Sequence, residues 1–184
     1  MTNTTETSTL TIDFTGKVNS LSQISSYDDQ LKDEIREKAS KDISTFVVID
    51  TGYAGHFDKP VIVSDHLNLT GTNPLVGPNN PIGERFPVVN DIYLDTKQAN
   101  DCLSGVQVAD NLESQKVAAG VKPGVVPTDS EIALINKLGG DFYCYNLVPT
   151  ALIIAHAKKK LVGVILPPKM KPVENLAQLL GGAL

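Results

Sequence analysis

The stretch that decides the fold runs from Ser64 to Tyr93. It begins Ser-Asp-His-Leu-Asn-Leu-Thr-Gly-Thr-Asn-Pro-Leu-Val-Gly-Pro-Asn and, after four residues, continues with Glu-Arg-Phe-Pro and then Asn-Asp-Ile-Tyr. The apolar run Val61 to Val63 just before it predicts a buried strand. The stretch itself is dense in Gly, Pro, Asn and Asp, with almost no helix or strand periodicity. A loop of this length inside one domain indicates a binding surface or a contact with a partner subunit.

This stretch resembles a hallmark of the trimeric purine nucleoside phosphorylases, D-H-I-N-L-T-G-x-N-P-L-x-G-P-N followed by R-F-P and D-x-Y. In this chain the three parts read Asp65 to Asn79, Arg85 to Pro87 and Asp91 to Tyr93. The similarity runs from about Phe46 to Leu166. The resemblance implies an α/β sandwich fold and a chain that associates with copies of itself.

Composition sets the class of protein. The chain has 184 residues, of which 41% are hydrophobic and 20% charged, as in an ordinary soluble globular domain. We expect a mobile N-terminal tail over residues 1–8 and one domain over residues 9–184. A net charge of −5 argues against nucleic acid as the main partner.

Two further features of the sequence indicate where in the cell the protein is expected. No apolar run approaches the roughly 20 residues that a membrane helix needs, so we expect no membrane partner. Cys102 and Cys144 lie far apart and form no metal-ligand cluster. We therefore expect a reduced, intracellular and cytoplasmic protein without a metal site.

Apolar periodicity predicts alternating strands and helices. Thr128 with Glu131 three residues later makes a capping box, so a helix is expected over 128–138. The other expected helices follow Ser26 or span 96–110, 149–159 and 173–180, and the expected strands span 10–14, 45–49, 61–63, 115–121, 142–145 and 161–166. This alternation predicts a three-layer α/β sandwich with a central mixed β-sheet flanked by helices, of the nucleoside-phosphorylase type.

The turn from Asp50 to Gly55 follows the expected strand 45–49. Ligands bind at the carboxyl ends of strands in open α/β sheets, which makes Asp50 a candidate for substrate contact. His56 lies just after this turn and is the best histidine for a replacement phosphate or substrate contact. His66 and His156 are interpreted as structural.

Several functional parts of the family are not found in the sequence. The resemblance implies a G-S-G-L-G phosphate loop and an R-x-H segment, but the residues before Phe46 contain no Gly-x-Gly and no His. The carboxylate of the family's G-P-x-F-E-T has no counterpart between Gly124 and Asp129, and Lys169 stands where the family has a base-binding Asn. The chain is thus expected to be a shortened and divergent member.

The resemblance also assigns residues to the remaining site. The family's G-M-S-T, whose Ser touches phosphate, reads Cys-Tyr-Asn-Leu here, so Asn146 takes the Ser position and Tyr145 the position of the Met below the ribose. Phe86 matches the residue that covers a neighbour's ribose in the trimers. The candidate substrate-binding residues are Asp50, His56, Phe86, Tyr145 and Asn146; no catalytic residue is assigned.

Two functions remain open at this point. The first is a catalytically inactive relative that acts as a structural or assembly subunit. The second is an active or ligand-binding purine nucleoside phosphorylase with a rebuilt site, which cleaves purine nucleosides to base and ribose 1-phosphate. Only the second needs inorganic phosphate as co-substrate, and neither needs a cofactor. In both cases we expect a homo-oligomer, with a trimer favoured because Phe86 and the loop from Asn73 to Asn79 belong to an interface in the family.

Overall fold

The computed structural model describes residues 8–41, 43–78, 89, 91–103 and 112–181. Its strands are β1 (Ser8–Asp13), β2 (Ile43–Thr51), β3 (Val61–Asn68), β4 (Glu113–Gly120), β5 (Phe142–Cys144) and β6 (Lys160–Leu166). Its helices are α1 (Asp29–Ala39), α2 (Thr96–Cys102), α3 (Asp129–Lys137), α4 (Leu147–His156) and α5 (Leu176–Leu180).

The strands form one mixed sheet in the order β1-β2-β6-β3-β4-β5. All neighbouring strands run parallel except β3 and β6, which pair antiparallel over three residues from Val61 to Val63. The central strands carry long apolar runs such as Phe46 to Ile49 because both faces of the sheet are buried.

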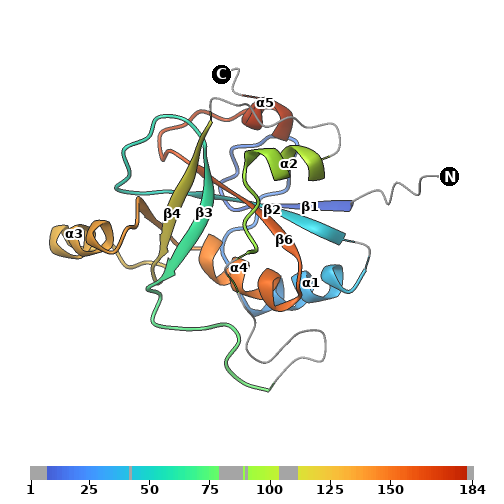
Figure 1. The fold of residues 1–184 in the computed structure, drawn as a ribbon, viewed down its shortest axis with the longest axis horizontal. Coiled ribbons are helices and arrows are strands. Elements are labelled where there is room, and N and C mark those ends of the chain that lie inside the picture. The colour runs from blue at the N-terminus through green and yellow to red at the C-terminus, as the bar shows by residue number, and fades with distance from the viewer. Residues whose placement is uncertain (1–7, 42, 79–88, 90, 104–111, 182–184) are drawn as a thin grey trace.

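Helices cover both faces of this sheet (Figure 1). On one face, α1 and α4 pack against alternate residues of the central strands, among them Phe46 and Val48. On the other face, α2 and α5 pack against the intervening residues Val47 and Ile49. This three-layer arrangement around a mixed sheet confirms the predicted fold class.

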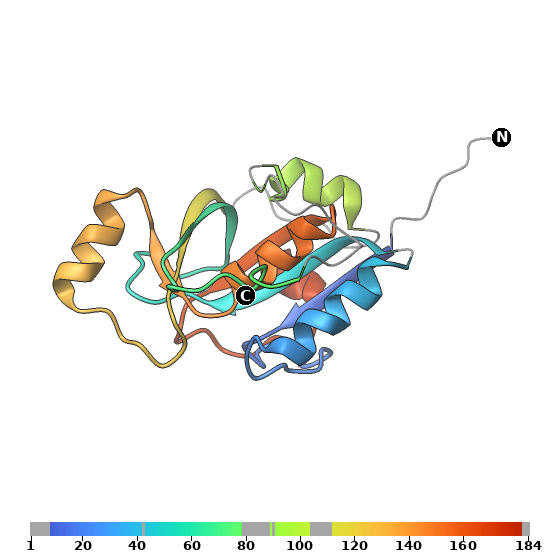
Figure 2. The same cartoon turned by 90° about the horizontal axis from the view of Figure 1, so that it is seen from below.

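Helix α3 stands apart from these layers. It projects from the β4–β5 end of the sheet (Figure 2), and Ile135 is its buried residue. The helix forms because Thr128 and Glu131 make the predicted capping box, with both reciprocal hydrogen bonds present.

Several element boundaries differ from the sequence prediction, among them the end of β3 and the start of α4. Strand β3 continues past Val63 to Asn68, because the polar residues from Asp65 onward pair with β4. Helix α4 begins at Leu147 rather than at Pro149. Pro149 lies within the first turn, where its missing N–H group would have no partner inside the helix anyway.

Other differences lie at the ends of strands and helices; for example, α5 begins at Leu176 and not at Val173. Helix α2 ends at Cys102, and the rest of its predicted range lies largely outside the described residues. Within the part of the chain that is described, none of the helices combines the length and apolar character needed to cross a membrane.

Candidate functional site

The candidate site is built around Asp50, which lies at the carboxyl end of β2. Its side chain is 3% exposed. Oδ2 accepts hydrogen bonds from the backbone N–H groups of Asn146 at 2.8 Å and Leu147 at 2.9 Å. Oδ1 accepts from the backbone N–H of Thr51 at 2.9 Å and from Nδ2 of Asn146 at 3.2 Å.

These contacts make Asp50 the cap of helix α4. The first N–H groups of a helix have no partner within the helix and carry partial positive charge. Asn146, at the N-cap position of α4, makes no side-chain cap of its own. The carboxyl group of Asp50, reaching across from β2, therefore satisfies two of the amide groups at this end of the helix, those of Asn146 and Leu147.

Burial and hydrogen bonding shift the pKa of Asp50 in opposite directions. Burial raises the pKa of Asp50 above its usual value and is the larger effect, whereas the hydrogen bonds from Asn146, Leu147 and Thr51 lower it. All of these partners are donors, so the oxygens of Asp50 serve only as acceptors for them.

Asn146 is fully engaged within the protein. Its Nδ2 donates to Asp50, and its Oδ1 accepts from the backbone N–H of Tyr27 at 2.9 Å. The residue is buried. Asn146 thus joins the segment before α1 to the carboxyl end of β2 and the start of α4.

Tyr145 belongs to a cluster of three tyrosines beside this network. The ring of Tyr53 lies 5.3 Å from that of Tyr143 and 5.5 Å from that of Tyr145, and the Tyr143 and Tyr145 rings are 5.8 Å apart. Oη of Tyr145 donates to the backbone carbonyl of Val125 at 3.0 Å. Burial and the neighbouring tyrosines raise the pKa of Tyr145 to about 12, so its hydroxyl stays protonated at neutral pH.

The other two sequence candidates are not part of this network. His56 is exposed on the turn after β2, and its side chain takes no part in the hydrogen bonds of Asp50 and Asn146 described above. Phe86 lies outside the described residues. The structure therefore brings together Asp50, Tyr145 and Asn146 of the five candidates.

Sequence reasoning missed Tyr53, Tyr143 and Tyr27 as contributors to the site. Tyr53 lies inside the turn from Asp50 to Gly55, so its place at the ligand end of the sheet could have been read from the sequence. Tyr27 could not, because it is 119 residues from its partner Asn146.

An open pocket of about 360 Å³ lies near the carboxyl ends of β2 and β6. It is lined by Phe57, Asp58, Pro167, Pro168, Lys169 and Met170. Nζ of Lys17 holds the turn after β6 by donating to the backbone carbonyl of Pro168 at 2.7 Å. The pocket contains Lys169, the residue at the position of the family's base-binding Asn. Among the described residues, no His, Cys, Asp and Glu side chains gather into a group that could hold a metal ion.

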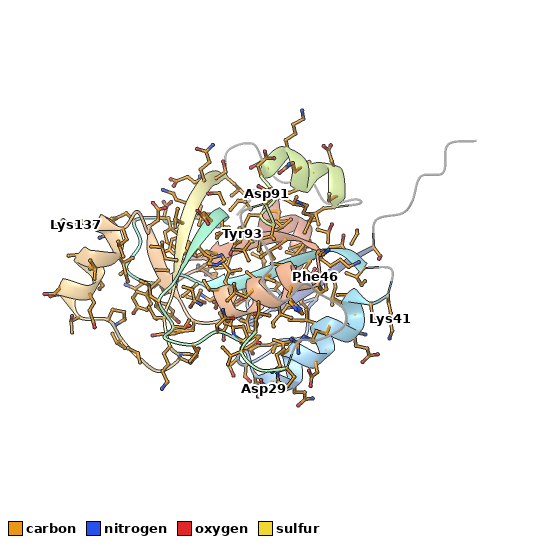
Figure 3. All side chains as sticks on the ribbon, turned by 60° about the horizontal axis from the view of Figure 1, so that its bottom comes forward. Asp29, Lys41, Phe46, Asp91, Tyr93 and Lys137 are labelled. Carbon is orange, nitrogen blue, oxygen red and sulfur yellow. The ribbon has the colours of Figure 1, made fainter. Side chains whose placement is uncertain are left out.

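A side-chain hydrogen bond joins the start of the 64–93 stretch to its end. Nδ1 of His66 on β3 lies 2.9 Å from Oη of Tyr93. Tyr93 lies in the interior of the molecule (Figure 3) and is bridged to Leu161 of β6. Burial lowers the pKa of His66 and is partly opposed by the charge of Asp65, which indicates a neutral, structural histidine.

Comparison with known proteins finds relatives over part of the chain. No family model matches the chain. Purine nucleoside phosphorylase 1 of Geobacillus stearothermophilus is 33% identical over 111 residues, which cover 56% of this chain and 38% of that protein. The purine nucleoside phosphorylase of Mycobacterium tuberculosis is 33% identical over 119 residues, covering 65% of this chain and 38% of that protein.

Solved structures show the same fold. Purine nucleoside phosphorylase of Schistosoma mansoni in complex with inosine has a TM-score of 0.62 and 24% identity, covering 75% of this chain and 52% of that chain. The Schistosoma enzyme in complex with guanosine has a TM-score of 0.63 and 23% identity, covering 78% of this chain and 59% of that chain.

The chain has the α/β fold of these purine nucleoside phosphorylase structures. The sequence matches go further: the chain is a relative of the purine nucleoside phosphorylases, as the 64–93 stretch predicted. The matched segment spans less than half the length of these curated relatives.

Proposed function

We propose that this chain is a catalytically inactive relative of the purine nucleoside phosphorylases that acts as a structural or assembly subunit. The observation that carries the proposal is the contact of Asp50 with the first amide groups of α4. The resemblance puts a phosphate-binding Ser at the position of Asn146, which is the residue in that contact.

The physical reason lies in what phosphorolysis requires. Phosphate must be held in line with the bond to be cleaved, and the departing base must be stabilised as it gains negative charge, so catalysis depends on positioning and electrostatics. An internal carboxyl group already uses the amide donors at this point. Loss of a single such donor typically lowers kcat by about two to three orders of magnitude.

Two substitutions at the base end point in the same direction. The segment from Gly124 to Asp129 has no glutamate at the matching position, and Lys169 replaces the base-binding Asn. A lysine cannot both accept and donate hydrogen bonds as an amide does. Each change removes a contact to the leaving base.

The decisive experiment tests phosphate-dependent cleavage of inosine and measures the release of hypoxanthine. A purified purine nucleoside phosphorylase run under the same conditions shows that the assay works. We expect no release above the enzyme-free blank at micromolar concentrations of this chain. Release that requires phosphate would refute the proposal.

The second candidate is an active or nucleoside-binding protein with a rebuilt site. It is favoured by the open pocket that contains Phe57, Asp58 and Lys169, since an aromatic wall beside charged groups fits a planar polar ligand. Inorganic phosphate is its co-substrate. A rise in melting temperature with guanosine or hypoxanthine would support binding, and the absence of a shift at millimolar ligand would exclude it.

As an assembly subunit, the chain is proposed to form a homo-oligomer, with a trimer favoured through Phe86 and the loop from Asn73 to Asn79. Both cysteines are free, which supports a reduced, cytoplasmic setting. Light scattering of the purified chain measures the oligomeric state. A strict monomer at all concentrations would contradict this part of the proposal.

A further inference from the structure

A groove of about 270 Å³ lies between α3 and the ends of β3 and β4, and we call it the α3 groove. The loop between β4 and α3 completes it. Its apolar lining consists of Leu69, Val121, Val125, Pro127, Leu134 and Ile135, and its charged lining of Lys122 and Glu131. None of these described residues is aromatic, so the groove suits an aliphatic chain better than a planar base.

The apolar lining of the α3 groove is open to solvent. Leu69, Val125 and Leu134 are 42%, 45% and 53% exposed. Covering such side chains is favourable by about 25 cal/mol per Å² of apolar surface removed from water. Because this surface is hollowed, a flat partner would leave it unfilled, whereas a flexible alkyl chain can follow it.

The α3 groove is held in a fixed shape. Oη of Tyr145 donates to the backbone carbonyl of Val125 and holds the loop. Ile135 anchors the helix to the buried cluster that contains Val121 and Tyr143. The projection of α3 from the sheet leaves the surface accessible (Figure 2). Because the groove is already ordered, a ligand that fills it loses little free energy to ordering of the protein.

The two charged residues of the groove differ in what they offer a ligand. Oε2 of Glu131 accepts from the backbone N–H of Thr128 at 2.7 Å, and its charge lies at the N-terminus of α3, where the helix dipole offsets it. Among the described residues, the ammonium group of Lys122 has no hydrogen-bond or ion-pair partner. Lys122 is therefore the charge that remains for a ligand, and an ammonium group pairs with a carboxylate.

We propose that the α3 groove binds a medium-chain fatty acid, with the alkyl chain in the groove and the carboxylate on Lys122. A volume of about 270 Å³ is that of about nine water molecules, which an alkyl chain of roughly eight to ten carbons fills. The groove shares no lining residue with the network around Asp50 and requires neither nucleoside nor phosphate. The proposal therefore goes beyond the proposed function.

Isothermal titration of the purified full chain with decanoate, below its micelle concentration, is the first test. We expect one bound ligand per chain. Burial of each added CH₂ group strengthens binding about fourfold, so affinity should rise along the series hexanoate, octanoate, decanoate. Absence of binding at millimolar decanoate, or an affinity that does not depend on chain length, would overturn the proposal.

A pair of leucine variants tests the location. Leu134 lines the groove and Leu138 does not, although both are 53% exposed. Leu134→Glu puts a carboxylate beside the alkyl chain and should weaken decanoate binding about tenfold or more, whereas Leu138→Glu should stay within about twofold of wild type. Circular dichroism checks that both variants keep their helices. Equal affinities of wild type and Leu134→Glu would place the ligand elsewhere and overturn the proposal.

A charge reversal tests the pairing with Lys122. Lys122→Glu should weaken decanoate binding about fivefold and strengthen the binding of decyltrimethylammonium by a similar factor, since an exposed ion pair contributes about 1 kcal/mol at most. Lys171→Glu makes the same change at an exposed lysine outside the groove and should alter neither affinity by more than about twofold. A loss of affinity for both ligands, or for neither, would contradict the pairing.

These readouts are independent of activity. Release of hypoxanthine from inosine would refute the inactive role and leave the decanoate affinities unaffected. If a second copy or another protein covers the groove instead, decanoate will not bind to the purified chain, and the fatty-acid proposal fails while the inosine result stands.

Discussion

At the scale of single residues, Asp50 joins more of the structure than any other side chain of the site. Its oxygens accept from Thr51 on its own strand and from Asn146 and Leu147 at the start of α4. Asn146 then extends the connection to Tyr27, ahead of α1. A buried acceptor with this many donors is costly to replace, because each donor would be left without a partner.

Asp50→Asn should therefore destabilise the protein. The new NH₂ group is a donor and faces N–H donors, so at least one buried hydrogen bond is lost. We expect the free energy of unfolding, measured in urea, to fall by about 2–3 kcal/mol. Asp58→Asn, at an exposed residue near the same end of the sheet, is the control and should change stability little. Equal stability of the two variants would show that Asp50 does not hold α4.

His66 predicts a pH dependence of stability. Burial lowers its pKa below the ordinary 6.5, so below pH 6.5 the unfolded chain takes up a proton that the native protein does not. The stability contributed by neutral His66 is complete above pH 6.5 and is lost as the pH falls towards the native pKa, by at most about 1.4 kcal/mol per pH unit.

Urea unfolding of wild type and His66→Gln between pH 5 and 8 checks this prediction. The difference in stability between the two proteins should narrow below pH 6.5, since glutamine does not titrate there. His56→Gln, at the exposed histidine after β2, is the control and should follow the wild-type profile. A constant difference between wild type and His66→Gln would contradict the assignment.

At the scale of elements, α3 depends strongly on its cap, because Ile135 is its buried residue. Thr128→Ala removes the N-cap and should lower the local stability of α3 by about 1 kcal/mol. The measurement is amide hydrogen exchange across α3, where protection should fall while β2 and β6 keep theirs. Ser130→Ala, at an exposed position in the first turn of the same helix, should leave exchange unchanged.

The elements show where sequence reasoning succeeds. Thr128 and Glu131 specify α3 through local hydrogen bonds, so the pattern alone predicted where this helix starts. The apolar runs of β2 and β6 are equally local signals. The extension of β3 to Asn68 was missed because Asp65 and His66 break the apolar run, and only pairing with β4 makes them a strand.

At the scale of the whole molecule, one sheet joins the described elements, and both of its faces are covered. Strand β6 pairs with β2 on one side and β3 on the other. The buried clusters of the two faces therefore share their central strands. We propose that residues 9–184 form one cooperative domain.

Thermal unfolding of the purified chain tests this unity. Circular dichroism, which follows helices and strands, and tyrosine fluorescence, which follows the cluster at Tyr53, Tyr143 and Tyr145, should give coincident transitions. The five tyrosines and absence of tryptophan in the sequence make the second signal specific to tyrosine. Two separated transitions would divide the chain into independent units.

The sequence predicted which strand ends carry the site residues, but not how those ends lie relative to one another. Asp50 lies at the carboxyl end of β2, and Tyr145 and Asn146 follow β5, so each candidate could be assigned to the end of a strand. Their proximity could not be inferred, because β2 and β5 run antiparallel in the mixed sheet and are brought together by the bridge between Tyr53 and Tyr143. Tyr27 carries no sequence signal of its own, since its backbone N–H is the group that takes part.

Because Asp50 is part of the chain, it competes with any free anion for the amide groups at the start of α4. A tethered group acts at an effective concentration that can reach the millimolar range or beyond without any gain in intrinsic affinity. Orthophosphate or sulfate from solution would have to displace a competitor that never diffuses away. In this respect Asp50, at the end of β2, acts as a built-in competitor of anion binding at the N-terminus of α4.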